Sequence, residues 1–182
     1  IYHGHTGAGV HPINCDQSIN LKDPGQYARQ DSLEQLRNAN EEGKVGSPRD
    51  PPKGPMTESA DVHDDTYVDG KRAARAGEVI KQLAQNKDKP FFLACGFVRP
   101  HVPLVAPAKY FDLYDRDAME APVVPEDDLE DVPQIIRNYK RNSTSYGVTP
   151  DLHKGLLEAY YASISYMDAQ VGRVLDVLDE LE

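Results

Sequence analysis

The sequence lacks the features that mark several large functional classes. Lysine and arginine total 20 against 30 aspartates and glutamates, which gives a net charge of −10, and the basic residues are scattered along the chain. We therefore expect no nucleic-acid partner, because such proteins gather basic residues on one stretch or face. No apolar run approaches the roughly 20 residues that a membrane-crossing helix needs. No segment resembles a signal peptide, so the residues themselves give no cellular location.

Cysteine is also scarce, because the chain contains only Cys15 and Cys95. Cys95 lies within the apolar segment FFLACGF, as expected of a small buried side chain, whereas Cys15 lies in a polar segment. Two cysteines in such different settings do not indicate a disulfide framework, although a bond between them stays an alternative.

The chain begins at Ile1 without an initiator methionine and ends at Leu181 and Glu182 while a helical pattern is still running. Its 182 residues, of which 39% are apolar, are enough to bury one hydrophobic core. We therefore expect one domain, or part of one, from a longer protein.

The order of apolar patterns predicts an α/β fold. Apolar residues recur every three to five positions from Val68 to Leu83, directly after Asp64 and Asp65, and predict a helix with an acidic start. The continuous apolar run at 91–97 follows this helix and is typical of a parallel strand covered on both faces. A helix followed by such a strand is one unit of an α/β fold.

Loops and two further helices are predicted around this unit. Residues 1–31 show no periodicity, and residues 40–60 and 115–148 are rich in proline, glycine and acidic residues, as in exposed irregular connections. Residues 108–114 predict a short helix. The triplet Thr-Pro-Asp at 149–151 predicts the start of a long final helix, with a capping hydroxyl, a first-turn proline and an acid.

The clearest candidate for chemistry is His101, which stands between Pro100 and Pro103 just after the apolar run. Ligands of open α/β sheets collect beyond the carboxyl ends of the strands. Flanking prolines restrict the backbone and lower the entropic cost of holding an imidazole in one place. The alternative is a structural histidine that caps the strand end and bonds a carbonyl oxygen. The residues alone leave both interpretations open.

Two other groups contain residue types that bind metals. His3, His5 and His11 lie in a glycine-rich segment, but no cysteine or acid stands at a spacing typical of a zinc site. The triplet His-Asp-Asp at 63–65 would suit a hard cation, but acids at a helix start are also favoured by the helix dipole. We therefore expect no metal site within this chain.

Four segments, in order along the chain, resemble the type I sulfatases of the alkaline phosphatase-like superfamily. Residues 89–114, KPFFLACGFVRPHVPLVAPAKYFDLY, resemble the iduronate-2-sulfatase-like branch in particular, where a strand leads into Lys/Arg-Pro-His-x-Pro. Residues 160–182 resemble the long helix before the family's metal-binding strand. Residues 65–70 resemble the start of the helix that precedes the central strand, and residues 1–4 resemble the tail of the Gly-Lys-x-x-His motif.

The resemblance implies that residues 1–182 are an internal part of the N-terminal sulfatase catalytic domain, with 40–60 and 115–148 as loop-rich insertions. The implied fold is a three-layer α/β fold with a mostly parallel central sheet flanked by helices. The implied activity is hydrolysis of a sulfate ester, either a sulfated carbohydrate or a related small ester. Export to the periplasm, the extracellular space or the lysosome is implied with it.

Residue by residue, the resemblance implies two catalytic histidines and one substrate contact. His3 matches the histidine beside the nucleophile, and His101 matches the histidine near the leaving oxygen of the sulfate ester. Arg99 stands where the family often has lysine and is a candidate sulfate contact. The family's nucleophile is a formylglycine made from the cysteine of Cys-x-Pro-x-Arg, and it acts beside calcium. Neither Cys15 nor Cys95 fits that motif, so we expect the formylglycine and the calcium ligands outside this chain.

Two rival interpretations stay open. The same fold serves phosphodiesterases and phosphonate hydrolases, whose nucleophile is a bare threonine or serine with zinc ligands. A truncated scaffold without catalytic activity would bind sulfated glycans at most. In every case we expect the 182 residues alone to be inactive, because they lack the nucleophile and the cation.

Overall fold

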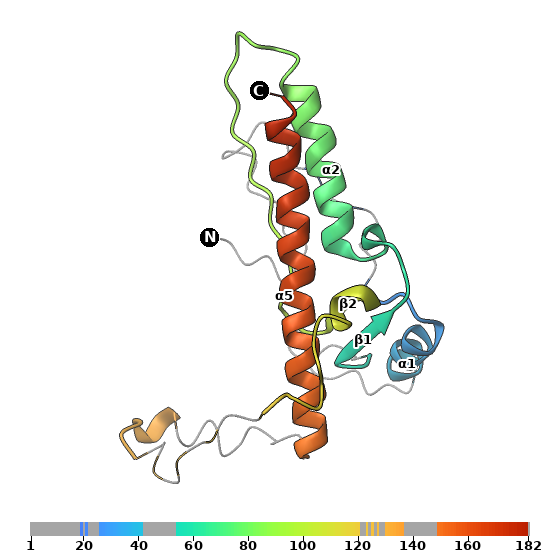
Figure 1. Cartoon of the computed structure of the whole chain (residues 1–182), viewed down its shortest axis with the longest axis vertical. Helices are drawn as coiled ribbons and strands as arrows, with labels where there is room; N and C mark the ends of the chain where they lie inside the picture. The colour runs from blue at the N-terminus through green and yellow to red at the C-terminus, as the bar shows by residue number, and fades with distance from the viewer. Residues whose placement is uncertain are drawn as a thin grey trace.

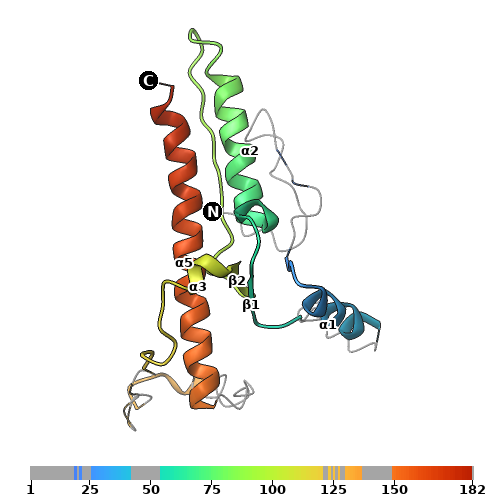
Figure 2. The ribbon, with the colours of Figure 1, turned by 45° about the vertical axis from the view of Figure 1, so that its right-hand side comes forward.

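The structure is a computed structural model, and it describes residues 19, 21, 26–41, 54–120, 123, 125, 127, 130–136 and 149–181. Its frame is a pair of long helices, α2 (Val68–Leu83) and α5 (Pro150–Asp179), which lie side by side (Figure 1). A small parallel sheet of β1 (Thr57–Ala60) and β2 (Leu104–Pro107) packs against α5 next to the start of α2 (Figure 2). Helices and a parallel sheet together confirm the predicted α/β class.

Helix α2 confirms the helix predicted from the apolar repeat. It is preceded by a single 3-10 turn, η1 (Asp64–Thr66), at which the His63 Nδ1 atom accepts a hydrogen bond from the Asp65 amide at 3.3 Å. The buried residues of α2 recur at helical spacing, so that one face of the helix is covered. That face packs against α5, which explains why the apolar pattern continues to the end of α2.

Strand β1 corrects the prediction that all of 40–60 is irregular loop. It pairs in parallel with β2, with Thr57 opposite Leu104 and Ala60 opposite Pro107. The Leu104 amide extends the pairing by donating to the Met56 carbonyl at 2.7 Å. Four residues are too few to show a clear two-residue repeat, and the pairing partner lies far along the chain. The local sequence therefore carries no sign of this strand.

The strand predicted at 91–97 is absent from the described structure. This segment runs back from the end of α2 toward β2 as extended chain (Figure 1). A strand is defined by hydrogen bonds to a neighbouring strand, and β1 and β2 pair only with each other in the described part of the chain. Phe91 is 44% exposed and Phe92 is 92% exposed, so this apolar surface is not covered here.

Helix α5 begins where the sequence predicts. The Thr149 hydroxyl caps it by accepting a hydrogen bond from the Leu152 amide at 3.2 Å. The buried face of α5 combines small and polar side chains with one aromatic ring. Its buried residues, which recur at the spacing of one helical face, are Ala159, Ala162, Ser163, Tyr166 and Gln170. Small side chains on this face allow α2 and the sheet to approach the helix closely.

Two further helices differ from the sequence predictions. Helix α3 (Ala108–Phe111) is shorter than the predicted 108–114, because the chain passes into turns from Asp112 onward. Helix α1 (Gln30–Glu41) was not predicted. It is mostly polar, and only Ser32 of its described side chains is buried. Such a helix has too few apolar residues to produce a clear repeat.

The core is built largely from tyrosines. Tyr166 of α5 makes edge-to-face contacts with Tyr110, at 5.4 Å between ring centroids, and with Tyr67, at 6.3 Å. Val105 and Ala106 of β2 complete the centre of this cluster, both fully buried. A tyrosine in a core must also satisfy its hydroxyl, so hydrogen bonds as well as apolar contacts determine how these elements pack.

The tight junction between η1 and α2 requires a glycine. A Cβ atom at Gly70 would lie 2.1 Å from the carbonyl oxygen of Asp64. The Gly70→Ala variant should therefore lose about 3 kcal/mol or more of unfolding free energy, the upper end for overpacked sites, because backbone must move. Denaturant unfolding of the full-length protein would measure this loss.

Gly172→Ala is the matched control for Gly70→Ala. Gly172 lies within α5, and nothing stands within 4 Å of a Cβ atom placed there. The control should leave stability unchanged or raise it by roughly 0.5–1 kcal/mol, since alanine is the better helix former. A Gly70→Ala protein that unfolds at the same denaturant concentration as wild type would contradict the packing described for this junction.

Candidate active site

His101 lies in a hydrogen-bonded turn that leads directly into β2. Its amide donates to the Val98 carbonyl at 2.9 Å, and its side chain is exposed. The ring Nδ1 atom lies 2.7 Å from the carbonyl oxygen of Val102. Because a carbonyl oxygen only accepts, Nδ1 is the donor in this bond, and Nε2 is the basic nitrogen of the neutral ring.

Arg99 lies beneath this turn rather than on the surface. Its residue is 5% exposed, and its guanidinium Nη1 donates a hydrogen bond to the His101 carbonyl. Burial lowers the pKa of the Arg99 guanidinium, and the nearby Asp69 carboxylate offsets part of that shift. The structure thus brings Arg99 and His101 together, as the sequence predicts, but through the backbone of His101.

Asp69 anchors the turn to α2. This carboxylate is completely buried in the first turn of the helix. Its Oδ1 atom accepts the Val98 amide at 2.8 Å, and its Oδ2 atom accepts the Arg99 amide at 2.8 Å. Arg72 adds a more distant ion pair, with Nη1 at 3.7 Å from Oδ1. Sequence reasoning missed Asp69, since an acid in a first helical turn is ordinarily explained by the helix dipole.

A second buried carboxylate, Asp64, fixes α2 to its neighbours. Its Oδ2 atom accepts hydrogen bonds from Tyr110 at 2.8 Å and Gln170 at 3.1 Å, and Oδ1 lies 2.7 Å from Lys109 Nζ. Burial raises the pKa of Asp64, but the bonds from Lys109, Tyr110 and Gln170 outweigh the effect of burial and hold the pKa below the ordinary value of 3.8.

The Tyr166 hydroxyl bridges the backbone of the same junction. It donates to the Asp64 carbonyl at 2.8 Å and accepts the Gly70 amide at 2.7 Å.

Both acids of the triplet at 63–65 are paired with cationic side chains of the protein. Asp64 is neutralised by Lys109, and Asp65 pairs with Arg173 at 2.6 Å. Within the described residues, no group of three or more histidine, cysteine or acidic side chains is arranged to hold a metal ion. His3, His5, His11 and Cys15 lie outside those residues, so their predicted roles stay predictions.

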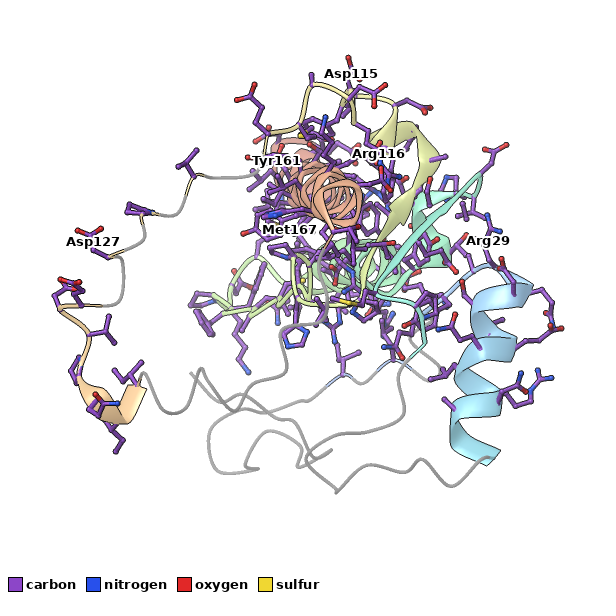
Figure 3. The ribbon with its side chains drawn as sticks, turned by 90° about the horizontal axis from the view of Figure 1, so that it is seen from below. Arg29, Asp115, Arg116, Asp127, Tyr161 and Met167 are labelled. Carbon is purple, nitrogen blue, oxygen red and sulfur yellow. The ribbon has the colours of Figure 1, made fainter. Side chains whose placement is uncertain are left out.

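A separate cleft of about 530 Å³ lies beside β1, between α1 and the start of α5. Arg29 and Arg116 line it from its two sides (Figure 3). Both are paired, Arg29 with Asp31 at 2.6 Å and Arg116 with Asp151 at 3.1 Å. Because their charges are compensated and His101 does not line the cleft, it is not by itself the candidate active site.

Cys95 does not have the setting of a reactive thiol. It lies on the extended segment after α2 and is half-buried and free. Burial raises the pKa of its thiol, which disfavours the thiolate. This placement agrees with the sequence interpretation of Cys95 as a small apolar side chain and not a nucleophile.

Comparison with known proteins gives the turn at 98–103 its context. The sulfatase family model matches residues 25–182, which include all the elements described above. The chain belongs to the sulfatase family. This confirms the family resemblance seen in the sequence, and with it the α/β fold of the alkaline phosphatase-like type.

Individual sulfatases are similar to the chain over part of its length. A sulfatase of Formosa agariphila is 41% identical over 106 residues, covering 55% of this chain and 20% of that protein. Human iduronate 2-sulfatase is 29% identical over 136 residues, covering 67% and 24% respectively. An arylsulfatase of Clostridium perfringens is 36% identical over 100 residues, covering 53% and 20%. The chain thus spans a fifth to a quarter of the length of these relatives.

Removing the Asp64 charge should change how stability depends on pH. Because the pKa of Asp64 is lower in the folded than in the unfolded state, its stabilisation is complete at neutral pH and is lost as the pH falls through the folded-state pKa. Asp64→Asn should cost roughly 1–3 kcal/mol at neutral pH, since buried donors lose a charged acceptor. It should also weaken the loss of stability in acid. Unfolding free energies measured from pH 7 to pH 3 for both proteins test this.

Asp112→Asn, at an exposed carboxyl after α3, controls for the loss of one negative charge. It should follow the wild-type stability curve. Wild type and Asp64→Asn losing stability in parallel as the pH falls would contradict the assigned role of the Asp64 carboxylate.

Proposed function

We propose that the full-length protein containing this chain is a sulfuric ester hydrolase. The observation that carries the proposal is the sulfatase family match across 25–182. Within that range lies His101, an exposed histidine whose turn is held by two hydrogen bonds to Asp69. The ring bonds a carbonyl oxygen, as the structural alternative expects, but no described strand ends at this turn, which favours the catalytic interpretation of His101.

His101 acts on the leaving oxygen of the sulfate ester. With Nδ1 donating to the Val102 carbonyl, the imidazole gains and loses its second proton at Nε2. Protonated, the ring places a positive charge and a donor beside the oxygen that departs as an alkoxide. The exposed position of the ring lets a substrate approach it directly.

Arg99 supports the same site from below. Its guanidinium is a buried positive charge, and among the described residues no acceptor bonds its Nε atom. Because this Nε atom is shielded from solvent, Arg99 supports the site through the field of its charge, and the direct sulfate contact predicted from the sequence stays a prediction. His3 completes the proposed set as the histidine beside the nucleophile.

The nucleophile and the cation come from outside these residues. The family pattern is a formylglycine beside calcium. The described residues do not fit the formylglycine motif, because Phe97 stands where the motif around Cys95 would need proline. They also hold no group of three or more histidine, cysteine or acidic side chains arranged to bind a metal ion. The formylglycine supplies the attacking oxygen when present. What this chain contributes is the positioned imidazole and guanidinium, and no step through the absent groups is derived from it.

The proposed substrate is a sulfated carbohydrate or a related sulfate ester, and the proposed location is outside the cytoplasm. Residues of both predicted insertions, Thr57 and Arg116 among them, line the cleft beside β1 and would form part of the substrate rim. None of the helices described is long and apolar enough to cross a membrane.

Replacing the imidazole tests the proposal directly. In the full-length protein, His101→Ala should lower turnover of a small aryl sulfate by roughly two to four orders of magnitude, the usual contribution of a general acid. The melting temperature should stay almost unchanged, because the ring is exposed and contributes little packing. Turnover and melting curves of the same preparations are the measurements.

His153→Ala, which removes an imidazole near the start of α5, is the matched control and should retain turnover. A His101→Ala protein that is less stable yet turns over normally per folded molecule would make His101 a structural cap. Faster hydrolysis of an aryl phosphodiester or phosphonate than of the sulfate would favour the related phosphoryl-transfer activity. No hydrolysis of any of these by the wild type would favour an inactive scaffold.

A further inference from the structure

Both oxygens of the Asp69 carboxylate accept hydrogen bonds from the turn that carries His101, and Arg72 adds a longer ion pair at 3.7 Å. Asp69 is 0% exposed, and each of its oxygens accepts one backbone amide of that turn, Val98 at one oxygen and Arg99 at the other, both at 2.8 Å. Bonds to an ionised acceptor are among the strongest that backbone amides make. The two amides are adjacent in the chain, so the carboxylate fixes both the position and the direction of the backbone there.

Val98 and Arg99 in turn hold the backbone of His101. Val98 accepts the His101 amide at 2.9 Å through its carbonyl, and Arg99 donates to the His101 carbonyl through its guanidinium. The amide and the carbonyl of His101 are therefore both held by Val98 and Arg99, the two residues whose amides Asp69 binds. The imidazole is then oriented by its own bond to the Val102 carbonyl.

The helix gains little from Asp69 that an exposed acid would not also give. A buried carboxylate costs several kcal/mol unless it is fully hydrogen-bonded, whereas a solvated acid in a first turn stabilises a helix without that cost. Two oxygens that each accept one of two neighbouring amides explain why an acid is used here. Asparagine has the same shape, but it offers only one acceptor and would direct an NH₂ group at the second amide.

We propose that Asp69 is a positioning residue for His101, which acts through the Val98–Arg99 backbone and touches no substrate itself. The inference rests on the proposed function, since it assigns Asp69 a role only through a catalytic His101. It assigns to the start of α2 a part in catalysis that the helix dipole does not explain.

A double-mutant cycle in the full-length enzyme tests the inference. Asp69→Asn should lower kcat for an aryl sulfate by about 100-fold, as a displacement of about 1 Å does, while KM changes little. In a His101→Ala background the same substitution should have almost no further effect, because residues that act as one unit are not additive. Hydrogen exchange should also become faster in the peptide that spans 98–101.

Glu78→Gln removes one negative charge from the exposed face of the same helix and should change none of these measurements. The kcat of each variant is calculated per folded molecule, so that partial unfolding is not counted as lost activity. Asp69→Ser, which is smaller and keeps one acceptor, serves as the second variant where Asp69→Asn does not fold. If both variants fail to fold, Asp69 supports the whole domain and the inference is overturned.

The remaining outcomes separate the two proposals. A His101→Ala enzyme with normal turnover would contradict the proposed function and with it the inference. A His101→Ala enzyme with little activity, combined with an Asp69→Asn enzyme of normal kcat, would overturn the inference alone. An Asp69→Asn loss of equal size with and without His101 would also overturn it, since Asp69 would then act by another route.

Discussion

The structure depends on burying two carboxylates, Asp64 in the η1 turn and Asp69 in the first turn of helix α2, which follows it. An ionised carboxylate is stable inside a protein only when its oxygens are paired with hydrogen-bond donors or with a cation. Asp64 meets this requirement with Lys109, Tyr110 and Gln170, while Asp69 meets it with two amides of the turn after the apolar segment. These partners come from α3, α5 and the turn at 98–103, so satisfying the two acids also arranges these elements around α2.

In this arrangement, buried residues join the elements, whereas the proposed catalytic side chain lies at the surface. Asp64 and Tyr166 join α2, α3 and α5 in the interior, and Asp69 joins α2 to the turn that carries His101. The imidazole is exposed, whereas Asp69 and Arg99, which hold the backbone of its turn, are buried. A sulfate ester at His101 would therefore meet a group whose position is set before binding, which is where electrostatic catalysis gains most.

The sequence predicted the elements whose signals are local. The repeat of α2 and the Thr149 cap of α5 lie within a few residues, and both are confirmed. Strand β1 was missed, because it exists only through pairing with a distant segment. The strand at 91–97 was expected from composition, but strand hydrogen bonds need a neighbour that the described residues do not supply. Asp69 was overlooked for a similar reason, since burial of one acid among several near a helix start depends on tertiary partners.

The central claim is that His101 is held in place to contact a sulfate ester at its leaving oxygen. A crystal structure of the full-length protein with a sulfamate analogue of an aryl sulfate tests this most directly. The account predicts the His101 Nε2 atom at about 2.7–3.2 Å from the bridging atom of the analogue, with Asp69 still bonded to the Val98 and Arg99 amides. An analogue bound beyond hydrogen-bonding reach of His101 would contradict the account.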